Sequence, residues 1–475
     1  MNVLIVSTNR NKFPAPVMPV GACMVAGAAA AAGHSVSFLD LMFEKDPVAV
    51  IRSMIERCRP DAIGLSIRNI DNNDMRNPVF FIPEMVPLMR AIRSTTASPV
   101  ILGGAAISVM PAEVLTALAA DAAVVGDGEV VFTKLLVCLE QRKPLDGLEG
   151  VLHRDHGVVR MNPCLSSPET DICPAPDYRH WVNVPAYRSQ LSATPVQTKQ
   201  GCQFQCVYCT YRMIEGSDYR LTDPARVADV VARLAASGHA DIDFVDSVFN
   251  APYDHAMAVC ESLARAPHQA RLQSLELNPL HFDDTLLLTM ERAGFVGMGL
   301  TVESASDPVL RGLRKGFTSR EVHRAAEVVR RHQLPCAWMF LLGGPGETRE
   351  TVQETIRFAE RSLRKQDVAF FTVGIRIYPG TELERIARKQ GLLTRAPAEM
   401  LDPVFYVSPE VEAGWMINEV NRSMGRNMNF INADTLNHSL LPAINRIGYG
   451  LGLRPPLWRY TRFIRQGLRM VGMDA

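Results

Sequence analysis

Three cysteines lie within eight residues of one another in the segment KQGCQFQCVYCTY. Cys202, Cys206 and Cys209 are spaced C-x3-C-x2-C, whereas the other seven of the ten cysteines are scattered along the chain. Three thiolates at this spacing fill three of the four iron positions of a [4Fe–4S] cluster and leave one iron open to a substrate or cofactor. A structural zinc site, the main alternative, requires four ligands, and the nearest histidines, His180 and His239, are distant in the sequence.

The composition of the chain indicates a multidomain enzyme of balanced charge. Its 475 residues exceed the roughly 150 residues of one typical domain, so we expect two or three domains. The 50 basic side chains balance the 50 acidic ones, which predicts no nucleic-acid partner. The chain shows no signal-peptide pattern, and no apolar run approaches the roughly 18 residues of a membrane span. We therefore expect a cytoplasmic location, where thiols stay reduced and closely spaced cysteines favour metal binding over disulfides.

Short apolar runs alternate with helical patterns over residues 1–145, which predicts a doubly wound, Rossmann-like α/β domain. The runs are continuously hydrophobic, as expected of parallel strands that are buried on both faces. They are NVLIVS (2–7), SVSFLDL (35–41), AIGLSIR (62–68), PVILGG (99–104) and AAVVGDG (122–128). Ligands of such sheets bind beyond the carboxyl ends of the strands, so residues 66–73, 103–108 and 126–129 mark the predicted binding site.

A second βα series follows a proline-rich connector at 146–194. Its predicted strands are PVQT (195–198), IDFVD (242–246), SLELN (274–278), GMGLTVES (297–304), CAWMFLLGG (336–344) and AFFTVGIRIYP (369–379). Asp223 and Pro224 predict the start of the first helix between them. Six βα units predict a partial (βα)6 barrel of the TIM type over 195–395 rather than a closed barrel of eight. Residues 396–475 lose this rhythm, and we expect a mainly helical extension there.

The cysteine spacing, with the aromatic Tyr208 before the last cysteine, resembles the signature of the radical S-adenosylmethionine (SAM) enzymes. In that family the open iron is chelated by SAM, and an electron from the cluster cleaves SAM to a 5′-deoxyadenosyl radical. The resemblance implies that Cys202, Cys206 and Cys209 are the cluster ligands. It also implies SAM contacts from Tyr208, from Asp246 and Ser247 to the amino group, from Glu303 and Ser304 near the ribose, from Arg314 to the carboxylate, and from Gly343 and Gly344 beside the adenine. The alternatives are structural: a glycine turn, a helix cap and an exposed helix arginine.

The first domain resembles the cobalamin-binding domain that is fused to many radical SAM enzymes. The resemblance implies cobalamin contacts from Pro19, Ser66, Arg68, Asn69, Gly103, Gly104, Gly126, Gly128 and Glu129, because glycine turns let the backbone approach a corrin ring closely. The segment after the first strand lacks the Asp-x-His-x-x-Gly motif that supplies a histidine to cobalt. Arg68 and Asn69 are therefore candidates for the lower face of cobalt. Alternatively, they only hydrogen-bond the loop or the corrin amides.

The two cofactors together imply a cobalamin-dependent radical SAM methyltransferase. In such an enzyme a methyl group passes from SAM through methylcobalamin to an unactivated carbon, or phosphorus, of the substrate, while the protein orients the reactants and excludes water. One alternative is non-methylating cyclisation or rearrangement on the same cofactors. Another is a cobalamin-binding sensor or carrier without catalysis, against which the intact cysteine triad argues. The sequence identifies no catalytic side chain beyond the cofactor sites.

The partners are predicted as classes only. We expect a small-molecule or lipophilic substrate, and an external electron donor of the flavodoxin or ferredoxin type. Trp338, Tyr378, Phe405 and Tyr406 are candidates for the wall of the substrate pocket, although aromatic residues at strand ends also form cores. The stretch RPPLWRYTRFIRQGLRMVG (454–472) mixes arginines with apolar side chains, which predicts either peripheral membrane contact or a basic helix packed on the barrel.

Removal of one cluster ligand tests the assignment of the two cofactors to different domains. We expect Cys206→Ala to abolish the broad visible absorption of an iron–sulfur cluster and to leave hydroxocobalamin binding intact. Anaerobic reconstitution with absorption spectroscopy measures the first effect, and gel filtration with cobalamin measures the second. Loss of both together would contradict the assignment.

Overall fold

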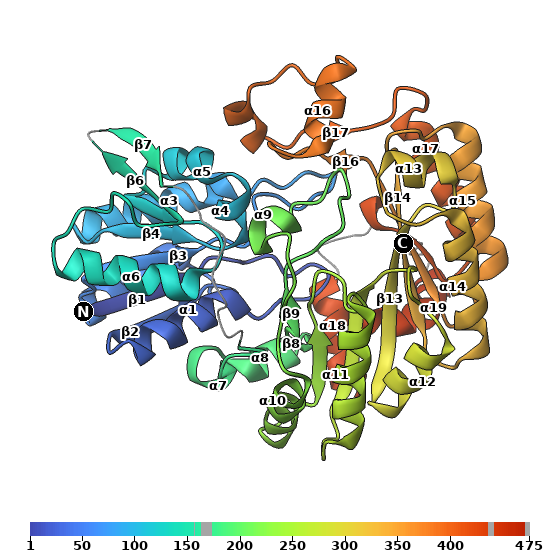
Figure 1. The fold of residues 1–475 in the computed structure, drawn as a ribbon, viewed down its shortest axis with the longest axis horizontal. Helices are drawn as coiled ribbons and strands as arrows, with labels where there is room; N and C mark the ends of the chain where they lie inside the picture. Colours follow the sequence, from blue (N-terminus) through green and yellow to red (C-terminus); the bar gives the residue numbers. More distant parts are fainter. Residues whose placement is uncertain (156, 163–172, 436–440, 471–475) are drawn as a thin grey trace.

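The computed structural model describes residues 1–155, 157–162, 173–435 and 441–470. Two α/β units lie side by side and are joined by the connector (Figure 1). The first unit contains a seven-stranded sheet in the order β2-β1-β3-β4-β5-β6-β7. Its five parallel strands are β1 (Asn2–Ser7), β2 (Ser35–Asp40), β3 (Ala62–Ser66), β4 (Val100–Gly103) and β5 (Ala122–Val124). These are the five predicted strands, and their order is that of a doubly wound sheet.

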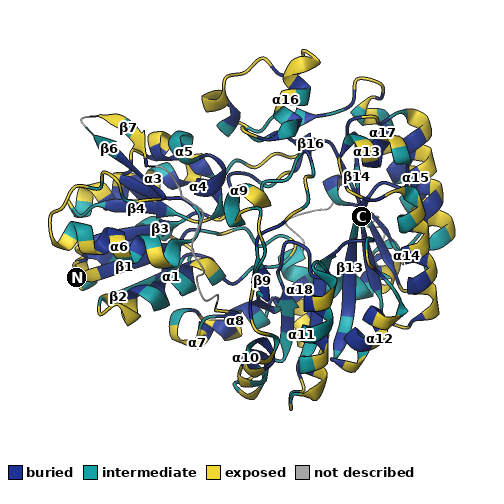
Figure 2. Ribbon diagram, viewed as in Figure 1, coloured by how far each residue is buried: buried dark blue, intermediate teal, exposed yellow. Residues whose placement is uncertain are grey.

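Helices cover both faces of this sheet because its strands are apolar on both sides. Val3 and Ile5 of β1 point toward one pair of helices, and Leu4 and Val6 point toward the opposite group. The first pair is α1 (Val20–Ala31) and α6 (Gly128–Glu140); the opposite group is α2 (Pro47–Cys58), α3 (Ile82–Thr95) and α5 (Pro111–Leu118), with the short α4 (Ala105–Val109) after β4. Figure 2 shows the buried strands between helices whose outer faces are exposed.

The connector contributes structure that the sequence did not predict. β6 (Val151–Asp155) and β7 (Val158–Met161) form an antiparallel hairpin that extends the first sheet beyond residue 145. β7 is short and largely exposed, so it lacks the hydrophobic run that identified the other strands. The helices α7 (Tyr178–Trp181) and α8 (Val184–Arg188) follow. Residues 163–172 of the connector, with Cys164, lie outside the described residues.

The second unit is an open barrel of seven parallel strands in the order β18-β15-β14-β13-β12-β11-β8. The strands are β8 (Thr194–Val196), β11 (Asp241–Phe244), β12 (Arg271–Leu277), β13 (Phe295–Glu303), β14 (Cys336–Leu342), β15 (Val368–Val373) and β18 (Phe430–Asn432). Outer helices are α10 (Pro224–Ala236), α11 (Tyr253–Arg265), α12 (Asp284–Arg292), α13 (Asp307–Gly312), α14 (Ser319–Arg331) and α15 (Arg349–Ser362). Six strands match the prediction. The seventh, β18, comes from the extension and pairs with β15.

The extension is mainly helical, as predicted. The helix α16 (Glu382–Lys389) precedes it. The elements of the extension are the 3-10 turn Pro397–Leu401, β17 (Phe405–Tyr406), which pairs with β16 (Ile375–Arg376), α17 (Ala413–Arg426), α18 (Leu441–Gly450) and α19 (Thr461–Met470). In α19, Arg465 is 5% exposed and donates to the carbonyls of Asn427 (2.9 Å) and Phe430 (2.7 Å). This contact supports the packed-helix interpretation of the basic stretch, of which residues 471–472 lie outside the described part. Within that part, no helix combines the length and apolar character needed to cross a bilayer.

A loop of the first unit reaches over the carboxyl-terminal mouth of the barrel. The loop connects β3 to α3, and its Asp71 accepts a hydrogen bond of 2.7 Å from Nε of Arg376 in β16. Both side chains of this ion pair are buried, at 0% and 3% exposure. Nearby, Tyr378 donates to Asn73 of the loop at 2.9 Å. These contacts fix the edge of the first sheet opposite the barrel mouth.

Removing one member of this buried pair should loosen the joint between the units. We expect Arg376→Met to lower stability by about 3–5 kcal/mol, because Asp71 would remain buried without a counter-charge. The matched control is Arg331→Met, which removes an exposed ion pair with Asp284 and should have a smaller effect. Thermal unfolding followed by circular dichroism compares them. Equal shifts for both variants would contradict a special role for the buried pair.

Candidate active site

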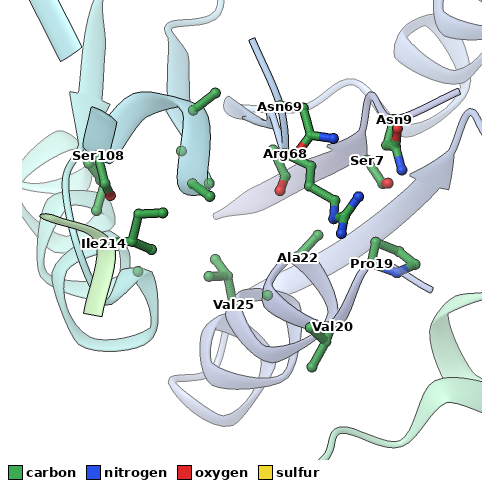
Figure 3. Close-up of a pocket in the computed structure, with 18 of the residues that line it drawn as sticks. Ser7, Asn9, Pro19, Val20, Ala22, Val25, Arg68, Asn69, Ser108 and Ile214 are labelled. Carbon is green, nitrogen blue, oxygen red and sulfur yellow. The ribbon is translucent and has the colours of Figure 1, made fainter. Parts of the chain in front are cut away.

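A cavity of about 500 Å³ lies between the two units, at the carboxyl ends of the first sheet's strands (Figure 3). It is lined by all nine residues for which the sequence implied cobalamin contacts: Pro19, Ser66, Arg68, Asn69, Gly103, Gly104, Gly126, Gly128 and Glu129. The barrel side contributes Gln197, Gln200, Thr210, Tyr211, Ile214, Glu215 and Tyr378. The predicted residues of the first domain therefore face residues that follow the first barrel strands across one space.

The shape of the cavity fits cobalamin. A Cβ atom added to Gly103 or Gly126 would meet no other atom within 4 Å, so these two backbones stand open to the cavity. Gly104 has φ +94°, and a Cβ there would lie 2.5 Å from the carbonyl oxygen of Ile67, so glycine is required at this position. The cavity also extends inward to Phe132, which lies beneath the sheet. The open backbones of Gly103 and Gly126, here called the glycine ledge, and the mainly apolar lining of the cavity suit a corrin ring and its nucleotide tail.

Arg68 extends into this cavity from the end of β3 (Figure 3). Desolvation lowers the pKa of its guanidinium, yet an arginine remains charged at physiological pH. The structure thus places a cation on the cobalamin side of the cavity. Its position at the lower face of cobalt stays a prediction.

The cysteine loop follows β8 and β9 (Lys199–Gln200) and precedes α9 (Tyr211–Glu215), and β10 (Arg220–Leu221) pairs with β9. Gly201 starts the loop with φ +89°, and a Cβ there would lie 2.0 Å from the carbonyl oxygen of Asp218. The amide of Val207 donates to the carbonyl of Leu313 at 3.1 Å, and Val207 in turn accepts from the amide of Leu383 at 2.8 Å. The backbone therefore ties the loop to two other segments at the barrel mouth.

The three cysteines fit an iron–sulfur cluster. Cys202 is buried, whereas Cys206 and Cys209 are half-buried. Burial raises the pKa of the Cys206 thiol and raises that of Cys209 to about 12, so the thiolate forms need a positive partner such as bound iron. In the described residues no three His, Cys, Asp or Glu side chains are grouped to hold one metal ion. In a cluster each thiolate binds a different iron, so the three cysteines need not ligate one common ion.

Beside the cysteines lies a buried group of polar side chains. Glu303, at the end of β13, accepts hydrogen bonds at Oε1 from Tyr208 and, at 2.8 Å, from Nζ of Lys315. Its other oxygen, Oε2, is buried without a hydrogen-bond partner. Glu303 also has φ +58°, and the pairing of β13 with β14 shifts register there. A strained carboxylate with one unpaired oxygen beside the cluster loop fits an acceptor for a ligand hydroxyl, such as the SAM ribose.

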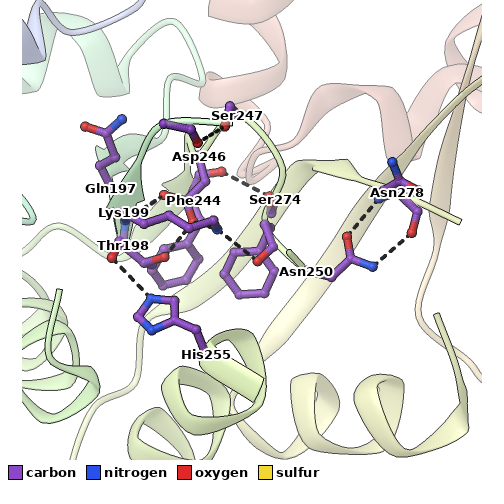
Figure 4. A network of polar contacts seen from close by, with 12 residues as sticks. Gln197, Thr198, Lys199, Phe244, Asp246, Ser247, Asn250, His255, Ser274 and Asn278 are labelled. Carbon is purple, nitrogen blue, oxygen red and sulfur yellow. Dashed lines mark hydrogen bonds and ion pairs between the residues drawn. The ribbon is translucent and has the colours of Figure 1, made fainter. Parts of the chain in front are cut away.

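Asp246, expected at the SAM amino group, already has partners for both oxygens (Figure 4). Oδ1 accepts from the amide of Thr198 at 2.7 Å, and Oδ2 accepts from Nζ of Lys199 at 3.1 Å. The Lys199 and Asp246 side chains are both fully buried. Ser247 donates to the carbonyl of Gly201 at 3.0 Å. The two residues therefore anchor the start of the cysteine loop, and their contact with SAM stays a prediction.

The remaining predicted SAM residues divide between the site and its supports. Arg314 is 51% exposed and pairs with Glu382 of α16 at 2.8 Å, while its neighbour Lys315 occupies the buried position. Ser304 is buried and its hydroxyl contacts that of Thr355 at 3.0 Å. The turn with Gly343 and Gly344 follows β14, as predicted, with Gly343 at φ +94°. Contacts of these four residues with SAM are not established.

Sequence reasoning missed several residues of the cavity. Glu215 accepts from Gln197 at 2.9 Å and from the amide of Gly201 at 3.2 Å, and burial raises its pKa to about 7. The only signal for Glu215 in the sequence is its position six residues after Cys209. Of the aromatic candidates, Tyr378 lines the cavity. Trp338 is fully buried in the barrel core, and that candidate is wrong as a pocket residue.

Two known domain families match the chain. The B12 binding domain matches residues 6–136, and the radical SAM superfamily matches residues 196–359. Both matches lie inside the domains expected at 1–145 and 195–395, whose boundaries remain predictions.

Relatives of known name cover most of the chain. An uncharacterised methyltransferase of Pyrococcus horikoshii is 26% identical over 367 residues, which are 76% of this chain and 76% of the relative. Tryptophan 2-C-methyltransferase of Streptomyces laurentii is 24% identical over 447 residues, covering 80% of this chain and 74% of the relative. The solved structure of the radical SAM methyltransferase TsrM from Kitasatospora setae, with cobalamin and a [4Fe–4S] cluster bound, has a TM-score of 0.86 at 21% identity and covers 99% of each chain. The likeness to TsrM is one of fold.

The fold and the site define an α/β enzyme in which a B12-binding domain faces a radical SAM barrel across one cavity. The chain thus combines a B12-binding domain with a radical SAM domain, the combination that defines cobalamin-dependent radical SAM enzymes.

A larger side chain on the glycine ledge should specifically weaken the binding of cobalamin. We expect Gly103→Val to reduce hydroxocobalamin binding at least about tenfold, because the new side chain enters open cavity from a strand that tolerates valine. Gly27→Ala is the control, since this helix position meets no atom within 4 Å and does not line the cavity. Absorbance-monitored titration measures binding. Unchanged affinity in the ledge variant would contradict the placement of cobalamin.

Proposed function

We propose that this enzyme transfers a methyl group from SAM to an unactivated carbon, or phosphorus, of a small-molecule or lipid-like substrate. When bound, the cluster supplies the electron that cleaves SAM and cobalamin carries the methyl group. The observation that supports the proposal best is the shared cavity, which joins the glycine ledge of the first domain to the residues that directly follow the cysteine loop. A group carried by cobalamin and a substrate in the barrel mouth would meet there.

The chain's own residues hold and orient the reactants in this scheme. Cys202, Cys206 and Cys209 would ligate the [4Fe–4S] cluster, and Glu303 would accept a hydrogen bond from SAM at Oε2. The loop between β3 and α3 closes the mouth, where Asn73 and Tyr378 both line the cavity. Closure excludes water from the reacting groups and so limits side reactions.

The relatives support a carbon acceptor. One is named for methylation at C2 of tryptophan, and TsrM was solved with tryptophan and a SAM analogue. On its barrel side the cavity is lined by two aromatic side chains, Tyr211 and Tyr378, and by the amides of Gln197 and Gln200. Such a wall suits a small planar or amphipathic molecule. An external electron donor of the flavodoxin or ferredoxin type would supply electrons.

An anaerobic turnover assay distinguishes methyl transfer from its alternatives. We expect the enzyme, loaded with iron, sulfide and hydroxocobalamin and given SAM with a strong reductant, to form S-adenosylhomocysteine together with methylated cobalamin, and also 5′-deoxyadenosine. Mass spectrometry quantifies the products. Two variants serve as controls. Gly103→Val should form no S-adenosylhomocysteine, and Cys202→Ala should form no 5′-deoxyadenosine.

Other outcomes of this assay would overturn the proposal. Deoxyadenosine without any methylation of bound cobalamin would indicate a cyclase or rearrangement enzyme. Neither product, with both cofactors bound, would indicate a carrier or sensor.

A further inference from the structure

The ammonium of Lys315 is a buried charge beside the cysteine loop. Its side chain is 5% exposed, and Nζ lies 2.8 Å from Oε1 of Glu303 and 3.4 Å from the hydroxyl of Tyr208. The same ammonium lies 5.8 Å from the ring centre of Tyr208 and 5.7 Å from that of Phe317. Burying an ammonium is costly unless partners surround it, and here two rings and a carboxylate do so.

The backbone holds Lys315 against the cysteine loop. The amide of Val207, which lies between Cys206 and Cys209, donates a hydrogen bond to the carbonyl of Leu313 in the turn after α13. A Cβ on Gly316 would lie 3.7 Å from the ring of Phe204, on the other side of Cys206. Residues of the turn before and after Lys315 therefore lie against the cysteine loop.

The ammonium lies directly against the cysteine loop. Nζ is 3.4 Å from the hydroxyl of Tyr208, which stands between Cys206 and Cys209 in the sequence. A buried cation at this place favours added negative charge on a cluster that the loop holds. The carboxylate of Glu303, 2.8 Å from Nζ, carries the opposite charge and opposes the effect.

We propose that Lys315 is a positioning residue that raises the reduction potential of the [4Fe–4S] cluster, and that Glu303 partly offsets this effect. Reduction adds one electron from an external one-electron reductant to the cluster and breaks no bond. The added negative charge is stabilised by a buried cation, because the low-dielectric surroundings screen the interaction weakly. The proposal rests on the cluster site proposed above and goes beyond it, since it assigns a residue that sets the driving force for reduction.

Redox titration without SAM tests the proposal. We expect Lys315→Gln to lower the ratio of reduced to oxidised cluster, at the wild-type midpoint potential, by about tenfold, which is 59 mV for a one-electron couple. Lys315→Arg keeps the charge and should keep most of the potential. The matched control is Arg314→Gln, which removes the adjacent but exposed cation and should leave the potential unchanged. Electron paramagnetic resonance measures the reduced cluster, and iron analysis confirms equal loading.

A double variant keeps the test decisive if the single variant does not fold. Lys315→Met with Glu303→Gln removes both charges, so no buried charge is left unpaired. Its potential should lie below that of Glu303→Gln, which keeps the ammonium, because the two variants differ only in the charge at position 315. A wild-type potential in a fully loaded Lys315→Gln, or equal potentials in the double variant and in Glu303→Gln, would overturn the proposal. A wild-type protein that binds no cluster would overturn this inference and the proposed function together.

Discussion

The buried ion pair between Asp71 and Arg376 holds the two domains against each other at the barrel mouth. It is buried on both sides, and it joins a loop of the B12-binding domain to a short strand at the barrel mouth. Both domains carry their functional residues at the carboxyl ends of parallel strands. Such edges cooperate only if they face each other, and this pair, with the bond from Tyr378 to Asn73, holds them so. The shared cavity is a consequence of that arrangement.

Two buried lysine–carboxylate pairs lie on either side of the cysteine loop. Lys199 with Asp246 fixes the strand that enters the loop, and Lys315 with Glu303 lies against its middle. A buried pair contributes little net stability, because desolvation of the charges offsets their attraction. What it provides is a fixed field and a fixed geometry. The positive backbone dihedral of Glu303 shows that the chain accepts strain at the same place, which is typical of functional sites.

Much of this architecture could be predicted from the sequence because the informative features are local. Continuous hydrophobicity marks strands that are buried on both faces, and the cysteine spacing marks a cluster. The glycine turns after β4 and β5 identified the cavity wall correctly. The hairpin β6–β7 was missed because its second strand is exposed. The strand β18 was missed because it is short and lies in the extension, where no βα alternation marks it.

The charged partners of the site could not be predicted in the same way. Arg314 and Lys315 are adjacent cations, and only the left-handed backbone at Arg314, with φ +53°, decides which side chain turns inward. Likewise, Asp246 pairs with Lys199, which lies 47 residues earlier in the sequence. Such pairings arise from tertiary packing, and no local pattern of residue types encodes them.

The proposed reaction requires that one cavity brings cobalamin and the cluster together. An anaerobic crystal structure of the enzyme loaded with both cofactors, with anomalous diffraction recorded at the cobalt and iron edges, tests it most directly. We expect cobalt between the ledge of Gly103 and Gly126 and the barrel mouth, and iron at Cys202, Cys206 and Cys209 facing the same cavity. Cobalt bound elsewhere, or iron separated from the cavity by the barrel wall, would contradict it.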